Sequence, residues 1–309
     1  MRRDGGTRRA PGPALACFVL ALSVLHWGLP APEPVSAAGQ RDTPQFSSGV
    51  QLVEVFATVT DARGEPVTGL AASEFVVRED DVVQPVSVFV EGAFPLTVAV
   101  GIDRSWSMSG EPLLQAKAAS RVFLSALRPE DRAMVLAISA EPEVVAPLSA
   151  SRSEQVRSIE SLDPWSTTAL RDALIDVLDR LEPEPGRLAV VVFSDGADRY
   201  SHATRSDVLA RARRSRALVY SIHLGRSTRG LLDEVAALTG GRSFHAVAPA
   251  QMTSTLEAVA SELRHQYLIG YTPTNGRRPG SGEWRSIRVS TTGRRGALRV
   301  RARAGYVAE

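Results

Sequence analysis

The stretch that decides the fold runs Leu96-Thr97-Val98-Ala99-Val100-Gly101-Ile102-Asp103-Arg104-Ser105-Trp106-Ser107. It starts as a mainly apolar run and ends abruptly in short polar side chains. A continuous apolar run bounded by turn-forming residues is typical of a strand buried on both faces, as strands of parallel sheets are. Open α/β sheets bind their ligands beyond the carboxyl ends of such strands. Asp103, Ser105 and Ser107 therefore lie where a binding site is expected.

The rest of residues 95–263 repeats this pattern of short apolar runs followed by amphipathic segments. Expected strands are Leu96–Ile102, Ala133–Ser139, Leu188–Phe193, Ala217–His223 and Ser243–Ala246, with an extra edge strand at Glu143–Leu148. Expected helices are Pro112–Leu127, Ala169–Leu181, Arg205–Ser215, Gly230–Leu238 and Pro249–Arg264. Alternating strands and helices predict an α/β fold with a Rossmann-like, mostly parallel sheet flanked by helices.

Two β-rich arms flank this region, at residues 46–94 and 264–309. Their strand candidates are Glu74–Glu79 and Pro85–Val90, around a turn at Asp80-Asp81, and then Gln266–Tyr271, Trp284–Val289 and Ala297–Ala302. Acidic residues outnumber arginines in the first arm, and arginines outnumber acidic residues in the second. A short sheet is only marginally stable by itself. We therefore expect the two arms to pack together into a small β domain; the alternative is two independent β segments.

The first residues have the outline of a secretory signal peptide, which we place at residues 1–38. Four arginines precede an apolar run, and small residues suited to cleavage follow at Val35-Ser36-Ala37-Ala38. The apolar run is short for a membrane span of about 20 residues. We expect a secreted or periplasmic, cell-envelope protein with no permanent membrane anchor after cleavage. Without the leader, acidic and basic residues balance, so composition gives no reason to expect nucleic-acid binding.

Five oxygen-bearing residues follow strand candidates and form one candidate metal site. They are Asp103, Ser105 and Ser107, then Thr168, then Asp195, which is followed by Gly196. Hard oxygen ligands suit magnesium, calcium or manganese rather than zinc or copper. The alternative interpretation is that the two serines only cap the helix that follows them.

The order Asp-x-Ser-x-Ser, distant Thr, distant Asp-Gly resembles the von Willebrand factor type A (VWA) domain with its metal-ion-dependent adhesion site (MIDAS). The layout also resembles a bacterial secreted family in which β arms flank this domain and the tail ends as Arg303-Ala304-Gly305-Tyr306 does here. The resemblance implies that Ser105, Ser107 and Thr168 bind Mg²⁺ directly, with Mn²⁺ or Ca²⁺ as alternatives. It implies that Asp103 and Asp195 act partly through water. An Asp or Glu of a partner protein would complete the coordination.

The expected function is therefore binding of a protein ligand that exposes an Asp or Glu, without catalysis. Trp106 and Trp165 flank the site residues and are candidates for partner contact, because tryptophan is enriched in interface hot spots. The sequence has neither a Gly-x-Ser-x-Gly elbow nor a Walker loop. His223 and His245 are expected to be structural, and Asp198 to be a solvated loop residue. Two alternatives remain open: a metal-dependent hydrolase or enzyme accessory protein, and an envelope protein with a structural metal.

Overall fold

The computed structural model describes residues 52–92, 94–224, 230–245, 249–274, 280–292 and 298–308. The proposed leader, residues 1–38, lies outside these ranges. So do Ala246 and Ala297, the ends of two expected strands. Within the described ranges, helices that are both long and apolar enough to cross a membrane are not found.

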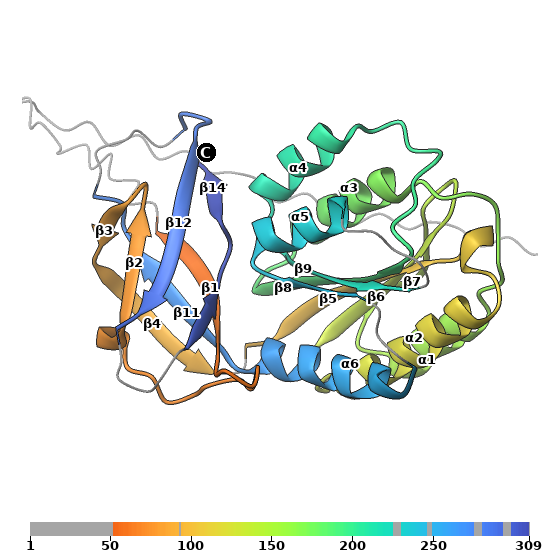
Figure 1. The fold of residues 1–309 in the computed structure, drawn as a ribbon, viewed down its shortest axis with the longest axis horizontal. Coiled ribbons are helices and arrows are strands. Elements are labelled where there is room, and N and C mark those ends of the chain that lie inside the picture. Colours follow the sequence, from red (N-terminus) through yellow and green to blue (C-terminus); the bar gives the residue numbers. More distant parts are fainter. Residues whose placement is uncertain are drawn as a thin grey trace, which may run out of the picture. The chain divides into compact units, whose positions relative to one another are not determined.

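A six-stranded sheet forms the central layer of the α/β region (Figure 1). Its order is β10 (Arg242–Phe244), β9 (Leu218–His223), β8 (Arg187–Ser194), β5 (Leu96–Asp103), β6 (Arg132–Ile138) and β7 (Glu143–Ser149). All neighbours are parallel except β6 and β7. The predicted α/β class is thus confirmed, and Glu143–Ser149 is the antiparallel edge strand.

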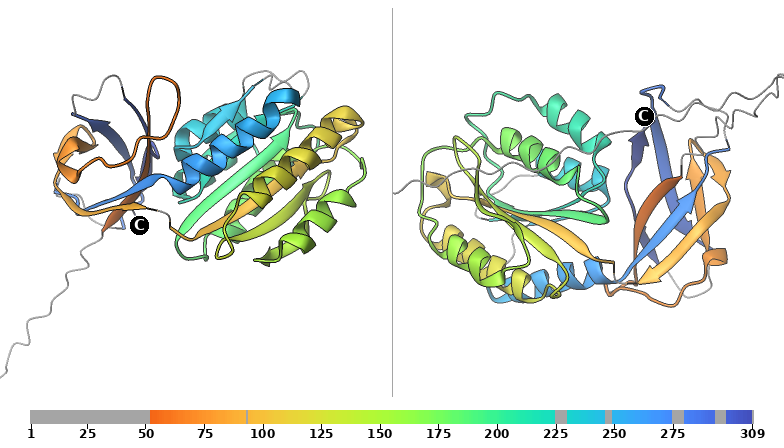
Figure 2. Two further views of the ribbon diagram at one scale, coloured as in Figure 1. Left: turned by 90° about the horizontal axis from the view of Figure 1, so that it is seen from below. Right: turned by 180° about the vertical axis from the view of Figure 1, so that it is seen from behind.

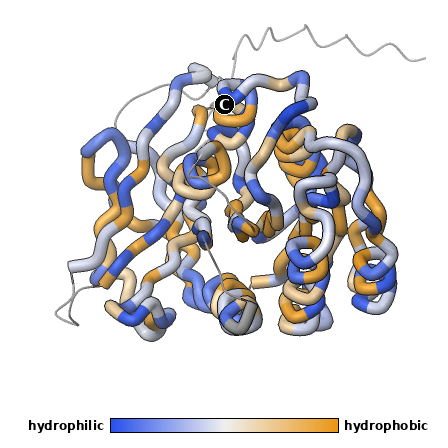
Figure 3. Tube along the Cα trace, turned by 45° about the vertical axis from the view of Figure 1, so that its right-hand side comes forward, coloured by the Kyte–Doolittle hydropathy of each residue, from blue (hydrophilic) through white to orange (hydrophobic). Residues whose placement is uncertain are grey.

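The central strand β5 is buried along its whole length because it has a helical layer on each face. Val98, Val100 and Ile102 point into one hydrophobic core and Ala99 into the other. The first core is completed by α1 (Glu111–Ser125), α2 (Arg152–Glu160) and α6 (Pro249–Arg264). The second is completed by α3 (Leu170–Leu181), α4 (Arg205–Arg214) and α5 (Leu231–Thr239). Figure 2 shows the two helical layers, and Figure 3 shows hydrophobic and hydrophilic residues alternating along the helices.

The strands of the two arms pair with each other in two four-stranded antiparallel sheets. One has the order β13 (Arg299–Arg301), β1 (Val53–Thr60), β11 (Gln266–Tyr271), β4 (Val86–Gly92). The other has the order β14 (Gly305–Val307), β12 (Trp284–Thr291), β2 (Phe75–Glu79), β3 (Val82–Gln84). Both sheets contribute side chains to one hydrophobic core. The expected small β domain is therefore a sandwich built from both arms.

A buried ion pair joins the two arms inside this sandwich. Arg285 of β12 lies 3.1 Å from Glu79 of β2, and both side chains are almost fully buried. The hydroxyls of Tyr271 and Tyr306 donate to the other Glu79 oxygen at 2.8 and 3.0 Å. A buried charge pair is stable only when further hydrogen bonds satisfy it. Here three residues of the second arm donate hydrogen bonds to one carboxylate of the first arm.

Two elements were not expected from the sequence. The expected strand Pro85–Val90 is present as β4, which begins just after Pro85, but it pairs with β11 in the other sheet. The hairpin partner of β2 is instead the short strand β3, the first of the two unexpected elements. Asp80 and Asp81 do form the turn, both with positive φ. Helix α2 was not expected at all. Its buried residues are Gln155 and Ile159, and the Gln155 amide donates to the carbonyls of Ala133 and Ser149.

We predict that Glu79→Gln lowers the free energy of unfolding by about 3–5 kcal/mol, because it leaves the buried Arg285 charge uncompensated. Arg288→Ala is the matched control, since Arg288 lies on the same strand and pairs with Asp81 while both side chains are exposed. It should cost less than about 1 kcal/mol. Urea denaturation of the two variants and the wild type checks this. Equal losses in both variants would contradict a special role for the buried pair.

Candidate functional site

The site begins at the carboxyl end of the central strand, where Asp103 is fully buried. Its Oδ1 accepts a hydrogen bond from the backbone N–H of Ser105 at 2.9 Å. Its Oδ2 accepts one from the hydroxyl of Ser194 at 2.7 Å. Because Ser194 ends β8, this one carboxylate joins the ends of two neighbouring strands and the loop that follows β5.

The two serines of the loop lie side by side. The Ser105 and Ser107 hydroxyl oxygens are 3.1 Å apart, with Ser105 buried and Ser107 exposed. The short 3-10 helix η2 (Trp106–Met108) follows Ser105, and Gly110 occupies the N-cap of α1. Ser105 is the N-cap residue of η2 but makes no side-chain capping hydrogen bond, so the alternative in which the serine side chains only cap the following helix is not supported. Their hydroxyls are directed toward each other instead.

Backbone hydrogen bonds bring Thr168 to the same place. The Trp106 N–H donates to the Ser166 carbonyl at 3.1 Å, and the Trp165 N–H donates to the Arg104 carbonyl at 2.7 Å. The loop 161–169 is thus fixed against the loop after β5. Ser166 has φ of 62°, a left-handed conformation that is uncommon outside glycine and clusters at functional sites. Thr168 itself is buried.

Asp195 follows Ser194 at the end of β8 and is half-buried. Its Oδ1 accepts the Ala197 N–H at 2.9 Å. Burial raises the pKa of Asp103, hydrogen bonds from Ser194 and Ser105 oppose that rise, and the negative charge of Asp195 adds to it. Two carboxylates that repel each other at one sheet edge favour a cation nearby.

A cavity of about 240 Å³ lies among these residues. Among the described residues, its lining is Ser105, Trp106, Ser107, Ser166, Thr167, Thr168, Ala197 and Arg199. The structure therefore places the three predicted hydroxyl ligands around one space. Asp103 lies behind it, bonded to the Ser105 backbone. This donor set, all oxygen with carboxylates behind hydroxyls, fits a hard divalent cation such as Mg²⁺.

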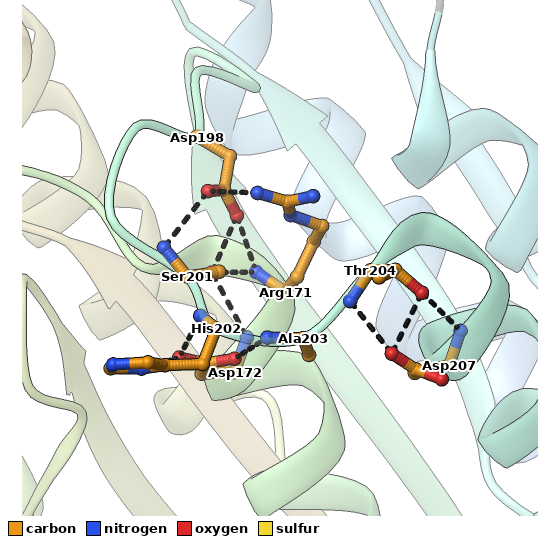
Figure 4. A network of polar contacts seen from close by, with 8 residues as sticks. All are labelled: Arg171, Asp172, Asp198, Ser201, His202, Ala203, Thr204 and Asp207. Carbon is orange, nitrogen blue, oxygen red and sulfur yellow. Dashed lines mark hydrogen bonds and ion pairs between the residues drawn. The ribbon is translucent and has the colours of Figure 1, made fainter.

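The loop after Asp195 is held by charged hydrogen bonds, shown in Figure 4. Asp198 accepts bonds from the Arg171 backbone N–H at 2.7 Å, the Arg171 guanidinium at 3.1 Å and the Ser201 hydroxyl at 2.7 Å. At the next residue of α3, Asp172 accepts hydrogen bonds from the backbone N–H groups of His202 and Ala203. Asp198 is thus a largely buried anchor at the start of α3, and the expectation of a solvated side chain was wrong.

Exposed aromatic residues lie beside the cavity. Trp106 is 65% exposed and Trp165 is 60% exposed, and Tyr200 is exposed to a similar degree. Trp106 lines the cavity, while Trp165 and Tyr200 line a neighbouring one with Arg104 and polar residues of the β6–β7 turn. Exposing such large rings to water is unfavourable, so these side chains are available for contact with a partner that covers them.

The comparisons with known proteins agree with this fold. Residues 98–198 match the model of the von Willebrand factor type A domain, so the chain contains a VWA domain. A von Willebrand factor type A protein from Catenulispora acidiphila matches with a TM-score of 0.51 at 14% identity, over 85% of this chain and 75% of that one. An aerotolerance-related membrane protein from Bacteroides fragilis matches with a TM-score of 0.47 at 16% identity, over 54% of this chain and 98% of that one. The curated proteins include no match.

We predict that Asp198→Asn destabilises the protein by about 1–3 kcal/mol near neutral pH, because hydrogen bonds to a charged group are lost. Burial raises the pKa of Asp198, but bonds from Arg171 and Ser201 outweigh it, so the folded pKa lies below the ordinary value. The stabilisation is therefore present above about pH 4, the ordinary Asp range, and is lost as pH falls through the folded pKa.

Urea denaturation between neutral pH and about pH 3 should show the difference between wild type and Asp198→Asn shrinking as pH falls. Asp176→Asn is the control, since Asp176 pairs with Arg180 on the outer face of α3. That variant should cost about 0.5 kcal/mol or less, as pairs spaced i,i+4 on helix surfaces do. A difference for Asp198→Asn that stays constant with pH would contradict the assigned ionic role.

Proposed function

We propose that this protein is an exported binding protein whose VWA domain holds a divalent cation and uses it to bind an acidic side chain of a partner protein. The observation that carries the proposal is the cavity that the Ser105, Ser107 and Thr168 hydroxyls share, with the Asp103 and Asp195 carboxylates at the same sheet edge. Mg²⁺ is the cation we favour, with Mn²⁺ or Ca²⁺ as alternatives.

The chemistry of the donor set explains why an acidic partner is expected. Neutral hydroxyls are weak donors, so a cation bound mainly by them keeps much of its positive charge for a further ligand. Both oxygens of Asp103 already accept hydrogen bonds from the protein. Its negative charge would therefore act on the ion only indirectly, through Ser105 and Ser194, which donate those bonds. A carboxylate from outside is the hard, charged ligand that such an ion binds best.

The surface beside the cavity supports a protein as the partner. Trp106 and Trp165 are large exposed apolar groups within a few residues of the proposed ligands. Tryptophan contributes strongly when it is buried at an interface. The ion would then give specificity for an acidic group, and the two indole rings would supply apolar contact around it.

The enzyme alternative needs a base that could activate a water molecule at the ion. The described residues that line the cavity are small, hydroxyl-bearing or aromatic, apart from Arg199, and none has a side chain that serves as a base near neutral pH. Arg199 is a cation and would attract an anionic ligand instead. We therefore propose binding without catalysis. The alternative of a purely structural ion gives no reason for both tryptophans to be exposed.

The metal part of the proposal predicts a stability change. Mg²⁺ or Mn²⁺ should raise the melting temperature, corresponding to about 2.7 kcal/mol at a hundredfold excess over Kd. Asp103→Asn and Thr168→Ala should abolish the increase. Ser109→Ala should keep it, because Ser109 lies exposed in the same loop but outside the proposed ligands. Identical melting curves of the wild type in chelator and in millimolar metal would refute the cation site.

The partner part predicts metal-dependent capture of an acidic protein from the cell envelope. Trp106→Ala and Trp165→Ala should each weaken the complex by about 30-fold or more, the effect of removing a hot spot. Leu114→Ala, which removes an equally exposed apolar side chain from α1, should leave binding unchanged. Converting the partner's Asp or Glu to the amide should break the complex. Metal-dependent turnover of a phosphoester, peptide or glycoside, lost in Thr168→Ala, would favour the enzyme instead.

A further inference from the structure

A second cluster of ligand-type side chains lies at the same edge of the central sheet, beyond β8. It consists of His223, Asp233 and His245, whose ligand atoms all lie within 4.8 Å of one another. The His245 Nε2 is 2.5 Å from the Asp233 Oδ1. The two imidazole rings are stacked with their centroids 4.1 Å apart and their planes 18° apart. We propose that these three residues form a binding site for a borderline divalent ion such as Zn²⁺.

The topology explains why residues so far apart in sequence meet. Strands β9 and β10 are parallel neighbours in which Ile222 is opposite Phe244. His223 and His245 each come one residue later, so the register places them next to each other. Gly240 ends α5 with φ of 84°, a left-handed turn that returns the chain to the sheet. Asp233 lies in the first turn of that helix, over the ends of the two strands.

Further hydrogen bonds orient the side chains as the supports of a metal site do. The Gly230 N–H donates to the Asp233 Oδ2 at 2.8 Å, which leaves Oδ1 directed at the histidines. The Ser221 hydroxyl lies 3.3 Å from the His223 Nε2 and donates to the Ser243 hydroxyl at 2.7 Å. His223 is buried, whereas the side chains of His245 and Asp233 are 30% and 26% exposed, so an ion can enter from solvent.

Ligand chemistry distinguishes this cluster from the cavity lined by Ser105, Ser107 and Thr168, which we call the oxygen cavity. Two imidazoles and one carboxylate are a ligand set that zinc takes, whereas hydroxyls and carboxylates suit magnesium. Tetrahedral zinc with bonds of about 2.0–2.1 Å separates its ligand atoms by roughly 3.3 Å. Side-chain rotations that open the short His245–Asp233 contact and close the wider ones would reach this spacing.

Three protein ligands leave the fourth position of a tetrahedral ion for water or an anion. One carboxylate and two neutral imidazoles also leave the bound ion with a net positive charge. The simpler alternative is that His245 and Asp233 only form an ion pair that secures the start of α5, with His223 packed against it. Metal titration separates these two interpretations.

The experiment is a titration of the metal-free, untagged protein with Zn²⁺, and with Co²⁺ as a spectroscopic substitute. We expect one Zn²⁺ per chain and visible cobalt absorption typical of tetrahedral coordination. His245→Gln and Asp233→Asn should weaken Zn²⁺ binding at least tenfold and remove the cobalt spectrum. Ser221→Ala, which removes a supporting hydroxyl, should weaken binding by about 10-fold.

Two control variants decide where the ion binds. His202→Ala should bind Zn²⁺ as the wild type does, because His202 is an exposed histidine outside the cluster. Asp103→Asn should also bind it normally, because the oxygen cavity is separate. Circular dichroism without metal shows whether each variant is folded. Wild-type protein without stoichiometric Zn²⁺ binding would overturn the proposal in favour of the ion pair. So would a folded His245→Gln variant that binds Zn²⁺ with wild-type affinity, or a cobalt spectrum that disappears in Asp103→Asn.

Discussion

The burial of the Asp103 carboxylate at the end of the central strand is the constraint on which the oxygen cavity depends. An ionised carboxylate in an apolar layer is costly unless both of its oxygens are hydrogen-bonded. The Ser105 N–H and the Ser194 hydroxyl meet this need, and in doing so they fix the loop after β5 and the end of β8. Ser107 comes two residues after Ser105, and Asp195 directly follows Ser194, so one buried charge fixes the two segments that carry these residues.

The α/β region and the two β arms are stabilised in different ways. The α/β region has a hydrophobic core on each side of its sheet, while each arm alone has too few strands to enclose one. The arms share a core and a buried ion pair, so each arm stabilises the other. Arg187, at the start of β8, is almost fully buried and donates to the Phe94 carbonyl and the Gln266 side chain. It thus contacts the chain where it enters the α/β region and where it leaves.

The sequence predicts the fold class and most elements because buried strands and amphipathic helices are local patterns. The elements it misses depend on distant partners. Helix α2 packs through Gln155, whose side-chain amide donates hydrogen bonds to carbonyls of β6 and β7. The short strand β3 is recognisable only from its pairing with β2, while β4 pairs in the other sheet. Four of the five proposed oxygen ligands lie at or shortly after the end of a strand, Thr168 lies between α2 and α3, and all five are recognisable by their order in the sequence. The Asp198 anchor and the His–Asp–His cluster have no such order. Asp198 meets Arg171 where a loop contacts the start of α3, and the register of β9 and β10 places His223 beside His245.

The pairing of β4 with β11 has a topological consequence. Gly92, at the end of β4, is the register partner of Gln266, at the start of β11. The chain therefore leaves the sandwich and returns to it at one pair of opposite residues in two antiparallel strands. In a simple β-hairpin a short loop would join these two residues, whereas here the whole α/β region does. Because its two connections to the sandwich lie close together, the α/β region could be replaced by another domain inserted at the same two points. Tension applied through it would break the hydrogen bonds between β4 and β11 one after another, starting at Gly92 and Gln266.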